Sequence, residues 1–140
     1  MYSKLESKYR RSKDGISLLN FIEVGNVLKV NDYFSDFEAF DNMGIQHKLS
    51  DFKGNFILLD FTKEFCEPCE KAIKELKIIN QNYSHEIKII SFSGEKSQAF
   101  WKKGIVRNAI QWLSLWDGNG ATGKTLMKYE SKISKIKKME

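Results

Sequence analysis

The pattern of apolar and polar residues predicts a strand, a helix and a second strand in the middle of the chain. The segment NFILLDF (55–61) is a continuous apolar run of strand length, which is typical of a strand buried on both faces. In residues 69–82, apolar side chains recur at spacings of three and four between charged ones, which predicts an amphipathic helix. EIKIISFS (86–93) is β-branched and strand-like. Two strands joined by a helix form a parallel pair in an α/β sheet.

The neighbouring segments extend this predicted sheet. Residues 35–54 are predicted to form a hairpin, in which the Asn and Gly of residues 41–44 supply the backbone freedom that a turn requires. Residues 95–111 are predicted to be helical with a break near Gly104. The segment WLSLWD (112–117) is predicted to be a third strand.

Length and composition fit one globular domain. A chain of 140 residues with 41% hydrophobic residues can bury its own core. Residues 1–15 are polar, and residues 16–30 are predicted to form a helix followed by a strand. No run approaches the roughly 18 apolar residues of a membrane span. The opening residues lack the apolar centre of a signal peptide, so the protein is either cytosolic or its leader is missing from this sequence.

The positive charge gathers at the C-terminal end. The net charge of +5 comes from 23 Lys and Arg against 18 Asp and Glu, and residues 128–140 hold five of the lysines. A nucleic-acid surface requires a wider basic patch with interleaved aromatic residues, so no nucleic-acid partner is expected. Leu126, Tyr129, Ile133 and Ile136 recur at helical spacing and predict a basic amphipathic helix. Such a helix would cover a sheet edge or dock on an acidic partner; a frayed tail is the alternative.

The stretch FCEPCEK (65–71) contains both cysteines and the only proline. Pro68 suits the first turn of a helix, which puts Cys66 at the helix N-terminus. Free N–H groups and the helix dipole there lower the pKa of a thiol from about 8.5. Cys69 lies one turn further on the same face, so Cys66 is predicted to attack a substrate disulfide and Cys69 to resolve the mixed disulfide. The carboxylate of Glu67 opposes thiolate formation and partly offsets the helix effect.

Two other interpretations of the cysteines remain open. A zinc site needs four ligands and this motif supplies two; His47 and His85 are the only histidines, and neither has a paired spacing. Each histidine is more typical of a solvated strand edge. Two inert core cysteines are the other alternative, which a strand-to-helix junction with proline disfavours.

Asp60 interrupts the apolar strand six residues before Cys66. A carboxylate buried there would have a raised pKa and could exchange protons with Cys69 during resolution. The alternative is a partly solvated aspartate at the end of the strand.

The stretch GNGATGKT (118–125) matches the phosphate-binding pattern GxxxxGK[ST], in which Lys124 would reach phosphates and Thr125 would hold magnesium. Only 15 residues follow Thr125, and they contain no later strand that ends in a metal-binding aspartate. An ordinary glycine-rich loop is therefore the preferred interpretation, and no nucleotide is expected.

The stretch GNFILLDFTKEFCEPCEKAIKEL resembles the active-site strand, motif and helix of the thioredoxin superfamily. The preceding SDFEAFDNMGIQHKLSDFKG resembles the lead-in hairpin of its TlpA/ResA-like thiol-disulfide oxidoreductases, and the resemblance covers residues 24–130. It implies that Cys66 is the exposed nucleophile, Cys69 its buried partner and Asp60 the buried acid. Pro68 and Phe65, with Glu67, would support the motif. Members exchange electrons with protein disulfides, commonly outside the cytoplasm.

The sequence also departs from this family pattern. Phe65 and Thr62 occupy places where members carry tryptophan, and Ala72 and Lys74 replace the usual glutamate and proline of the motif helix. Members continue into a cis-proline loop, two strands and a final helix, whereas no proline follows Pro68 here. The domain is therefore expected to be incomplete at its C-terminus.

These observations predict an α/β thioredoxin-like fold, with a central sheet flanked by helices and its C-terminal strands and helix missing or replaced by a basic helical tail. Residues 1–23 would be an N-terminal extension, 24–130 the thioredoxin-like domain and 131–140 a lysine-rich tail. The predicted function is thiol-disulfide exchange with protein substrates, without an organic cofactor or metal. An upstream thiol reductant is a further expected partner, and an uncovered sheet edge would favour self-association. The resemblance implies the periplasm or cell envelope, with the cytoplasm as the alternative.

Two other functions are weighed. A thioredoxin-like domain that has lost catalysis could still bind a partner protein. A peroxidase of the peroxiredoxin branch is the other. That branch places a proline and a threonine at fixed positions before its reactive cysteine, whereas here Thr62 precedes Cys66 by four residues and no proline lies upstream, so this function is disfavoured.

Overall fold

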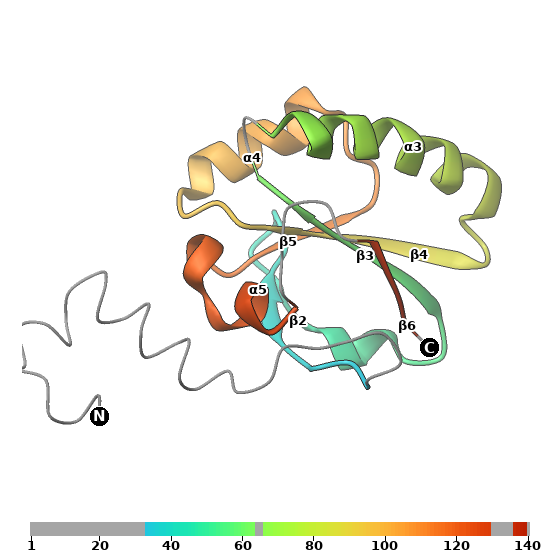
Figure 1. Cartoon of the computed structure of the whole chain (residues 1–140), viewed down its shortest axis with the longest axis horizontal. Helices are drawn as coiled ribbons and strands as arrows, with labels where there is room; N and C mark the ends of the chain where they lie inside the picture. The colour runs from blue at the N-terminus through green and yellow to red at the C-terminus, as the bar shows by residue number, and fades with distance from the viewer. Residues whose placement is uncertain (1–32, 64–65, 130–135, 140) are drawn as a thin grey trace, which may run out of the picture.

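The computed structural model describes residues 33–63, 66–129 and 136–139. Its strands are β1 (Glu38–Phe40), β2 (Gln46–Lys48), β3 (Phe56–Thr62), β4 (Ile87–Ser93), β5 (Leu113–Trp116) and β6 (Ile136–Met139). Its helices are α3 (Glu67–Tyr83), α4 (Gln98–Arg107) and α5 (Lys124–Lys128), with 3-10 turns η2 (Leu49–Phe52) and η3 (Gly120–Thr122). Within this part of the chain, the strands form one sheet in the order β2-β1-β5-β4-β3-β6 (Figure 1).

The centre of the sheet is parallel. Strand β3 pairs with β4 along its whole length, from Phe56 opposite Ile87 to Thr62 opposite Ser93, and β4 pairs in parallel with β5. The prediction of a parallel pair joined by a helix is confirmed, because α3 connects β3 to β4. Strands β1 and β6 are antiparallel to their neighbours, so the sheet is mixed.

The predicted hairpin is confirmed as β1 and β2. Asp41 organises its turn: Oδ1 accepts hydrogen bonds of 2.9 Å from the backbone N–H groups of Met43 and Ile45. Gly44 supplies the positive φ of 82° that side chains rarely tolerate. The hairpin therefore follows from local turn chemistry.

The two faces of the sheet differ in chemistry. One face carries an aromatic and aliphatic core, which α5 and the hairpin segment help to cover. Its buried members are Phe37, Ala39, Leu49, Ile57, Leu59, Phe61, Ile90, Phe92, Leu115, Leu126 and Tyr129. Helices α3 and α4 lie on the opposite face (Figure 1), where the buried apolar cluster consists of Leu58, Leu76 and Ile89. Polar side chains occupy much of the rest of that face, as described below.

Two sequence predictions are wrong. Residues 136–139 form strand β6 rather than part of a basic helix, and β6 pairs with β3 from Ile57 to Asp60. The physical reason is that β6 satisfies backbone groups of β3 that would otherwise lie at an open edge, a gain that helical spacing does not reveal. An uncovered edge at β3 is therefore not observed over these residues, and a C-terminal strand is present. Helix α4 also continues through Gly104 to Arg107 without a break.

The N-terminal extension (1–23) and the helix and strand predicted for 16–30 lie outside the described residues, as do most residues of the tail. Among the described helices, none has the length and apolar character needed to cross a membrane.

Candidate redox site

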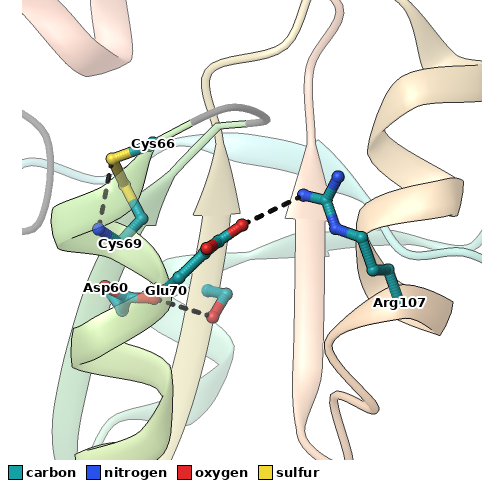
Figure 2. The surroundings of a disulfide bond; sticks show 6 residues. Asp60, Cys66, Cys69, Glu70 and Arg107 are labelled. Atoms are coloured by element: carbon teal, nitrogen blue, oxygen red, sulfur yellow. Dashed lines mark hydrogen bonds and ion pairs between the residues drawn. A yellow bond between two sulfur atoms is a disulfide. The ribbon is translucent and has the colours of Figure 1, made fainter.

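Cys66 and Cys69 form a disulfide at the start of α3, with their Cα atoms 5.2 Å apart (Figure 2). Cys66 is the N-cap residue of α3, with extended backbone angles, and its Sγ accepts a hydrogen bond of 3.2 Å from the backbone N–H of Cys69. The carbonyl of Cys66 accepts the N–H of Glu70 at 3.1 Å, which begins the helical hydrogen bonding. The predicted geometry is confirmed: the first sulfur caps a helix and the second lies one turn further on.

The local sequence explains why α3 begins here. Pro68 is the second helical residue, where its missing N–H costs nothing. Glu67 is exposed and forms an ion pair of 3.3 Å with Lys71, one turn along the helix. Ile73 and Leu76 bury the inner face of α3 against the sheet. Phe65, which was predicted to support the motif, lies outside the described residues.

The burial of the first cysteine differs from the prediction. Cys66 is only 5% exposed and Cys69 is 1% exposed, whereas Cys66 was expected to be the exposed member of the pair. Cys66 is bonded to a sulfur inside the first turn of α3, and this bond holds its side chain against the helix. In this oxidised form, Cys66 offers little surface to a substrate thiol.

Asp60 lies on β3 beneath the first turn of α3 (Figure 2). Its side chain is 1% exposed, and burial raises the pKa of its carboxyl to about 6, against a smaller lowering effect of a hydrogen bond from Ser91. The prediction of a buried carboxylate with a raised pKa is confirmed, and the alternative of a partly solvated aspartate is wrong. Among the described residues, Oδ1 of Asp60 has no hydrogen-bond partner.

Sequence reasoning missed a polar row beside Asp60. Asp60, Ser91 and Ser114 are register partners across β3, β4 and β5, so their side chains share one face. The hydroxyl of Ser91 donates to Oδ2 of Asp60 at 3.2 Å, and Nε1 of Trp112 donates to Oγ of Ser91 at 2.9 Å. Ser114 accepts separately from Nε1 of Trp101 at 2.9 Å. Serines at alternate positions of buried strands were the available signal.

A small cavity of about 30 Å³ lies between this polar face and the helices, enough for about one water molecule. Its lining includes Ser91, Ser93 and Ser114 from the sheet and Ile73 from α3. Arg107 of α4 also lines it, and its Nη2 lies 3.8 Å from Oε1 of Glu70 beside the disulfide (Figure 2). The site is therefore a disulfide at a helix N-terminus, with an acid and a polar layer behind it.

The histidines lie elsewhere. His47 Nε2 is 2.7 Å from Oδ2 of Asp41 in the hairpin, and its ring stacks on Phe52. His85 is exposed and follows α3. Within the described part of the chain, no three His, Cys, Asp or Glu side chains gather in a way that could hold a metal ion.

The glycine-rich stretch forms η3 and the short α5. Leu126 and Tyr129 anchor this segment in the aromatic core, where the Tyr129 hydroxyl donates to the carbonyl of Ser35 at 2.6 Å. These contacts suit a loop that packs against the domain.

Comparisons with known proteins agree with this fold and site. The thioredoxin domain of a thiol-disulfide oxidoreductase from Bacteroides vulgatus superposes with a TM-score of 0.67 and 25% identity, over 74% of this chain and 75% of that one. A thiol:disulfide interchange protein from Bacteroides sp. superposes with a TM-score of 0.69 and 24% identity, over 79% and 74% of the two chains. The fold is therefore thioredoxin-like, as predicted.

Sequence comparison gives the family. Residues 30–137 match the AhpC/TSA family. The thiol-disulfide oxidoreductase ResA of Geobacillus kaustophilus (strain HTA426) is 33% identical over 64 residues, which span 46% of this chain but only 35% of that relative. The chain therefore belongs to the AhpC/TSA family, and over these 64 residues it is similar to ResA.

Proposed function

We propose that the protein is a thiol-disulfide oxidoreductase that exchanges electrons with protein disulfides through Cys66 and Cys69. The observation that carries this proposal is the disulfide at the N-terminus of α3, in which Cys66 Sγ receives the Cys69 N–H. Partial positive charge at that position stabilises a thiolate, which is the attacking form in disulfide exchange. The relatives named as thiol-disulfide oxidoreductases support the same chemistry.

The proposed reaction starts from the reduced protein. The Cys66 thiolate attacks one sulfur of a substrate disulfide, which forms a mixed disulfide and releases the other substrate sulfur as a thiolate. Cys69 then gives its proton to the Asp60 carboxylate and attacks Cys66 Sγ. This step forms the Cys66–Cys69 disulfide and releases the second substrate thiolate, and both substrate thiolates take protons from water. Two electrons pass from the protein to the substrate, and an upstream thiol reductant restores the dithiol.

No organic cofactor or metal takes part in the proposed reaction, because the cysteine pair itself holds the two electrons. The direction of transfer in the cell depends on the reduction potential of the pair. We place the protein in the periplasm or cell envelope, because the TlpA/ResA-like proteins that it resembles commonly act outside the cytoplasm.

A matched pair of variants tests the proposal. With dithiothreitol, the native protein should reduce insulin disulfides, and both Cys66→Ser and Cys69→Ser should abolish turnover. Only Cys69→Ser should accumulate a mixed disulfide with an oxidised protein substrate, because it keeps the attacking thiol and lacks the resolving one. Thiol trapping across glutathione ratios gives the potential: a value near about −270 mV marks a reductant and one near about −120 mV an oxidant. Failure to form the intramolecular disulfide at any ratio would remove the enzyme hypothesis.

The 5% exposure of Cys66 favours a second candidate, a thioredoxin-like module that binds a partner without turnover. Under this alternative, Cys66→Ser leaves partner binding intact and the native protein never reduces insulin. Turnover by the native protein excludes it.

A further inference from the structure

We propose that Ser91 and Trp112 are positioning residues, which hold one hydroxyl hydrogen toward Asp60 and so keep this carboxylate ready to take the Cys69 proton. The part of this proposal that concerns the Cys69 proton rests on the proposed function. The hydrogen bonds among Trp112, Ser91 and Asp60 do not depend on it. Neither residue belongs to the cysteine motif, and each acts on the cysteines only through Asp60.

The first step of the argument is the direction of the hydrogen bonds. A serine hydroxyl has one hydrogen to donate and lone pairs that accept. The Trp112 indole can only donate, and its Nε1 lies 2.9 Å from Ser91 Oγ. The indole therefore occupies an acceptor position of Ser91 and leaves the hydroxyl hydrogen to point to Oδ2 of Asp60, 3.2 Å away.

The second step concerns burial. Asp60 is 1% exposed and Ser91 is 2% exposed, so water does not compete for this hydrogen bond as it would at the surface. A hydrogen bond to a charged group in such surroundings stabilises the ionised form more than one between neutral groups. The hydrogen bond from Ser91 lowers the pKa of the Asp60 carboxyl and burial raises it more, which leaves this pKa at about 6. At pH 7 the carboxylate then remains mostly ionised and can accept a proton.

The charged neighbours of Asp60 do not supply this effect. On α3, Glu70 is exposed, and its Oε1 lies 3.8 Å from Nη2 of Arg107. On β4, the side chains on the face of Asp60 are Ile89, Ser91 and Ser93, none of which titrates in this range. Strand β6 also adjoins β3, with Ile136 opposite Asp60 and Lys138 opposite Leu58. The causes that set the pKa of the Asp60 carboxyl are burial, which raises it, and the hydrogen bond from Ser91, which lowers it.

The structure contains a matched control. Ser114 lies in the same row as Ser91 and accepts an indole N–H in the same way, from Trp101 at 2.9 Å. Its hydrogen bond does not reach Asp60. Ser114→Ala thus removes a buried hydroxyl of the same kind, one strand further from Asp60, without touching the carboxylate.

The direct test titrates Asp60 in the oxidised protein by the ¹³C chemical shift of its carboxyl carbon, assigned with Asp60→Asn. Ser91→Ala should raise the midpoint by about one pH unit, because the carboxylate loses a charge-assisted hydrogen bond. Trp112→Phe should raise it by a smaller amount, and Ser114→Ala should leave it unchanged. If Ser91→Ala and Ser114→Ala have the same midpoint, the proposal is wrong, and a native midpoint in Trp112→Phe overturns the role of Trp112.

This titration needs no substrate, so its outcome is independent of whether the protein is an enzyme. If Ser91→Ala fails to fold, Trp112→Phe provides the measurement, because it removes one N–H from a half-buried ring and keeps an aromatic side chain. If the protein is active, the rate at which Cys69 resolves the mixed disulfide should fall at low pH. In Ser91→Ala, the pH of this fall should rise together with the Asp60 midpoint, and Ser91→Thr should return it to the native value. A shifted midpoint with an unmoved rate profile would overturn the catalytic part of the proposal.

Discussion

The sulfur of Cys66 accepts a hydrogen bond from the backbone N–H of Cys69, with 3.2 Å between the two atoms. The same sulfur caps α3, where unpaired N–H groups stabilise negative charge. Cys69 lies inside the first turn and is 1% exposed. The two cysteines are neighbours in sequence, but their electrostatic surroundings differ.

Reduced protein should therefore have one reactive and one unreactive cysteine. At pH 7, Cys66 in the Cys69→Ser variant should react with iodoacetamide at least about ten times faster than Cys69 in Cys66→Ser, because the thiolate fraction sets the rate. Alkylation followed by mass spectrometry gives both rates. Equal rates would show that burial of Cys66 cancels the effect of the helix N-terminus.

The disulfide should contribute little to the stability of the fold. It joins residues only three apart, and closing so short a loop removes little entropy from the unfolded chain. The free energy of unfolding of the oxidised protein should therefore exceed that of the reduced protein by at most about 2 kcal/mol. Urea unfolding with and without a thiol reductant measures this difference. A more stable reduced form would instead mark a strongly oxidising pair, because reduction would then be favoured by folding.

Asp60 should make the protein less stable as the pH rises. Burial raises the pKa of its carboxyl from 3.8 to about 6, so the folded state holds this proton more tightly than the unfolded state. The stability that protonated Asp60 provides is fully present below about pH 4 and is lost as the pH rises through 6. Asp60→Asn removes this dependence, so its free energy of unfolding relative to the native protein should rise by about 3 kcal/mol between pH 3.5 and 7. Urea titrations across this range provide the measurement.

Asp36 is the control for this prediction, since its shift has the opposite sign. The raising effect of burial at Asp36 is outweighed by hydrogen bonds from Ser50 and Phe37, so the pKa of its carboxyl is lowered. Asp36→Asn should lose stability relative to the native protein as the pH rises through the range where this carboxyl ionises. The same trend for both variants would contradict the assignment of the shift at Asp60.

The end of α4 offers a stabilising substitution. Ala109 has a positive φ of 48°, which glycine adopts with less strain. It occupies the left-handed position of a helix C-terminal motif. Its N–H donates a hydrogen bond to the carbonyl of Val106 at 3.1 Å, and the N–H of Ile110 donates to the carbonyl of Ile105 at 3.0 Å. Ala109→Gly should raise the free energy of unfolding by about 0.5–1 kcal/mol.

Ala99 is the control, because it is an exposed alanine in the first turn of the same helix. Ala99→Gly should lower the free energy of unfolding by about 0.5 kcal/mol, since glycine loses more backbone freedom in a helix. Thermal unfolding of both variants measures the contrast. A loss of stability in both would show that the backbone at residue 109 carries no strain.

The sequence predicted those elements whose signal is local. The apolar run of β3 and the helical spacing of α3 each lie within one segment, and the turn of the hairpin is specified by Asp41 and Gly44. The junction of β3 and α3 then placed the two sulfurs correctly. At the end of α4, by contrast, Gly104 suggested a break that the structure has at Ala109, because packing of Trp101 and the C-terminal hydrogen bonds determine where the helix stops.

Features that depend on pairing between distant segments were not predictable. Strand β6 forms because it finds an edge of β3 more than seventy residues earlier in the chain, and its own sequence favours a helix. The Asp60–Ser91–Trp112 chain requires the register of three strands, which no single segment specifies. The low exposure of Cys66 likewise depends on which of its neighbours pack around the closed disulfide.

Strand β6 meets β3 as far as Asp60, which faces Ile136 in the register of the two strands. If β6 separated from β3, water would reach the backbone on that side of Asp60, and the pKa of its carboxyl would fall toward that of an ordinary aspartate. Strand β6 thus keeps water from the backbone beside Asp60, so the proton affinity of this buried acid depends on a segment more than seventy residues away in the chain.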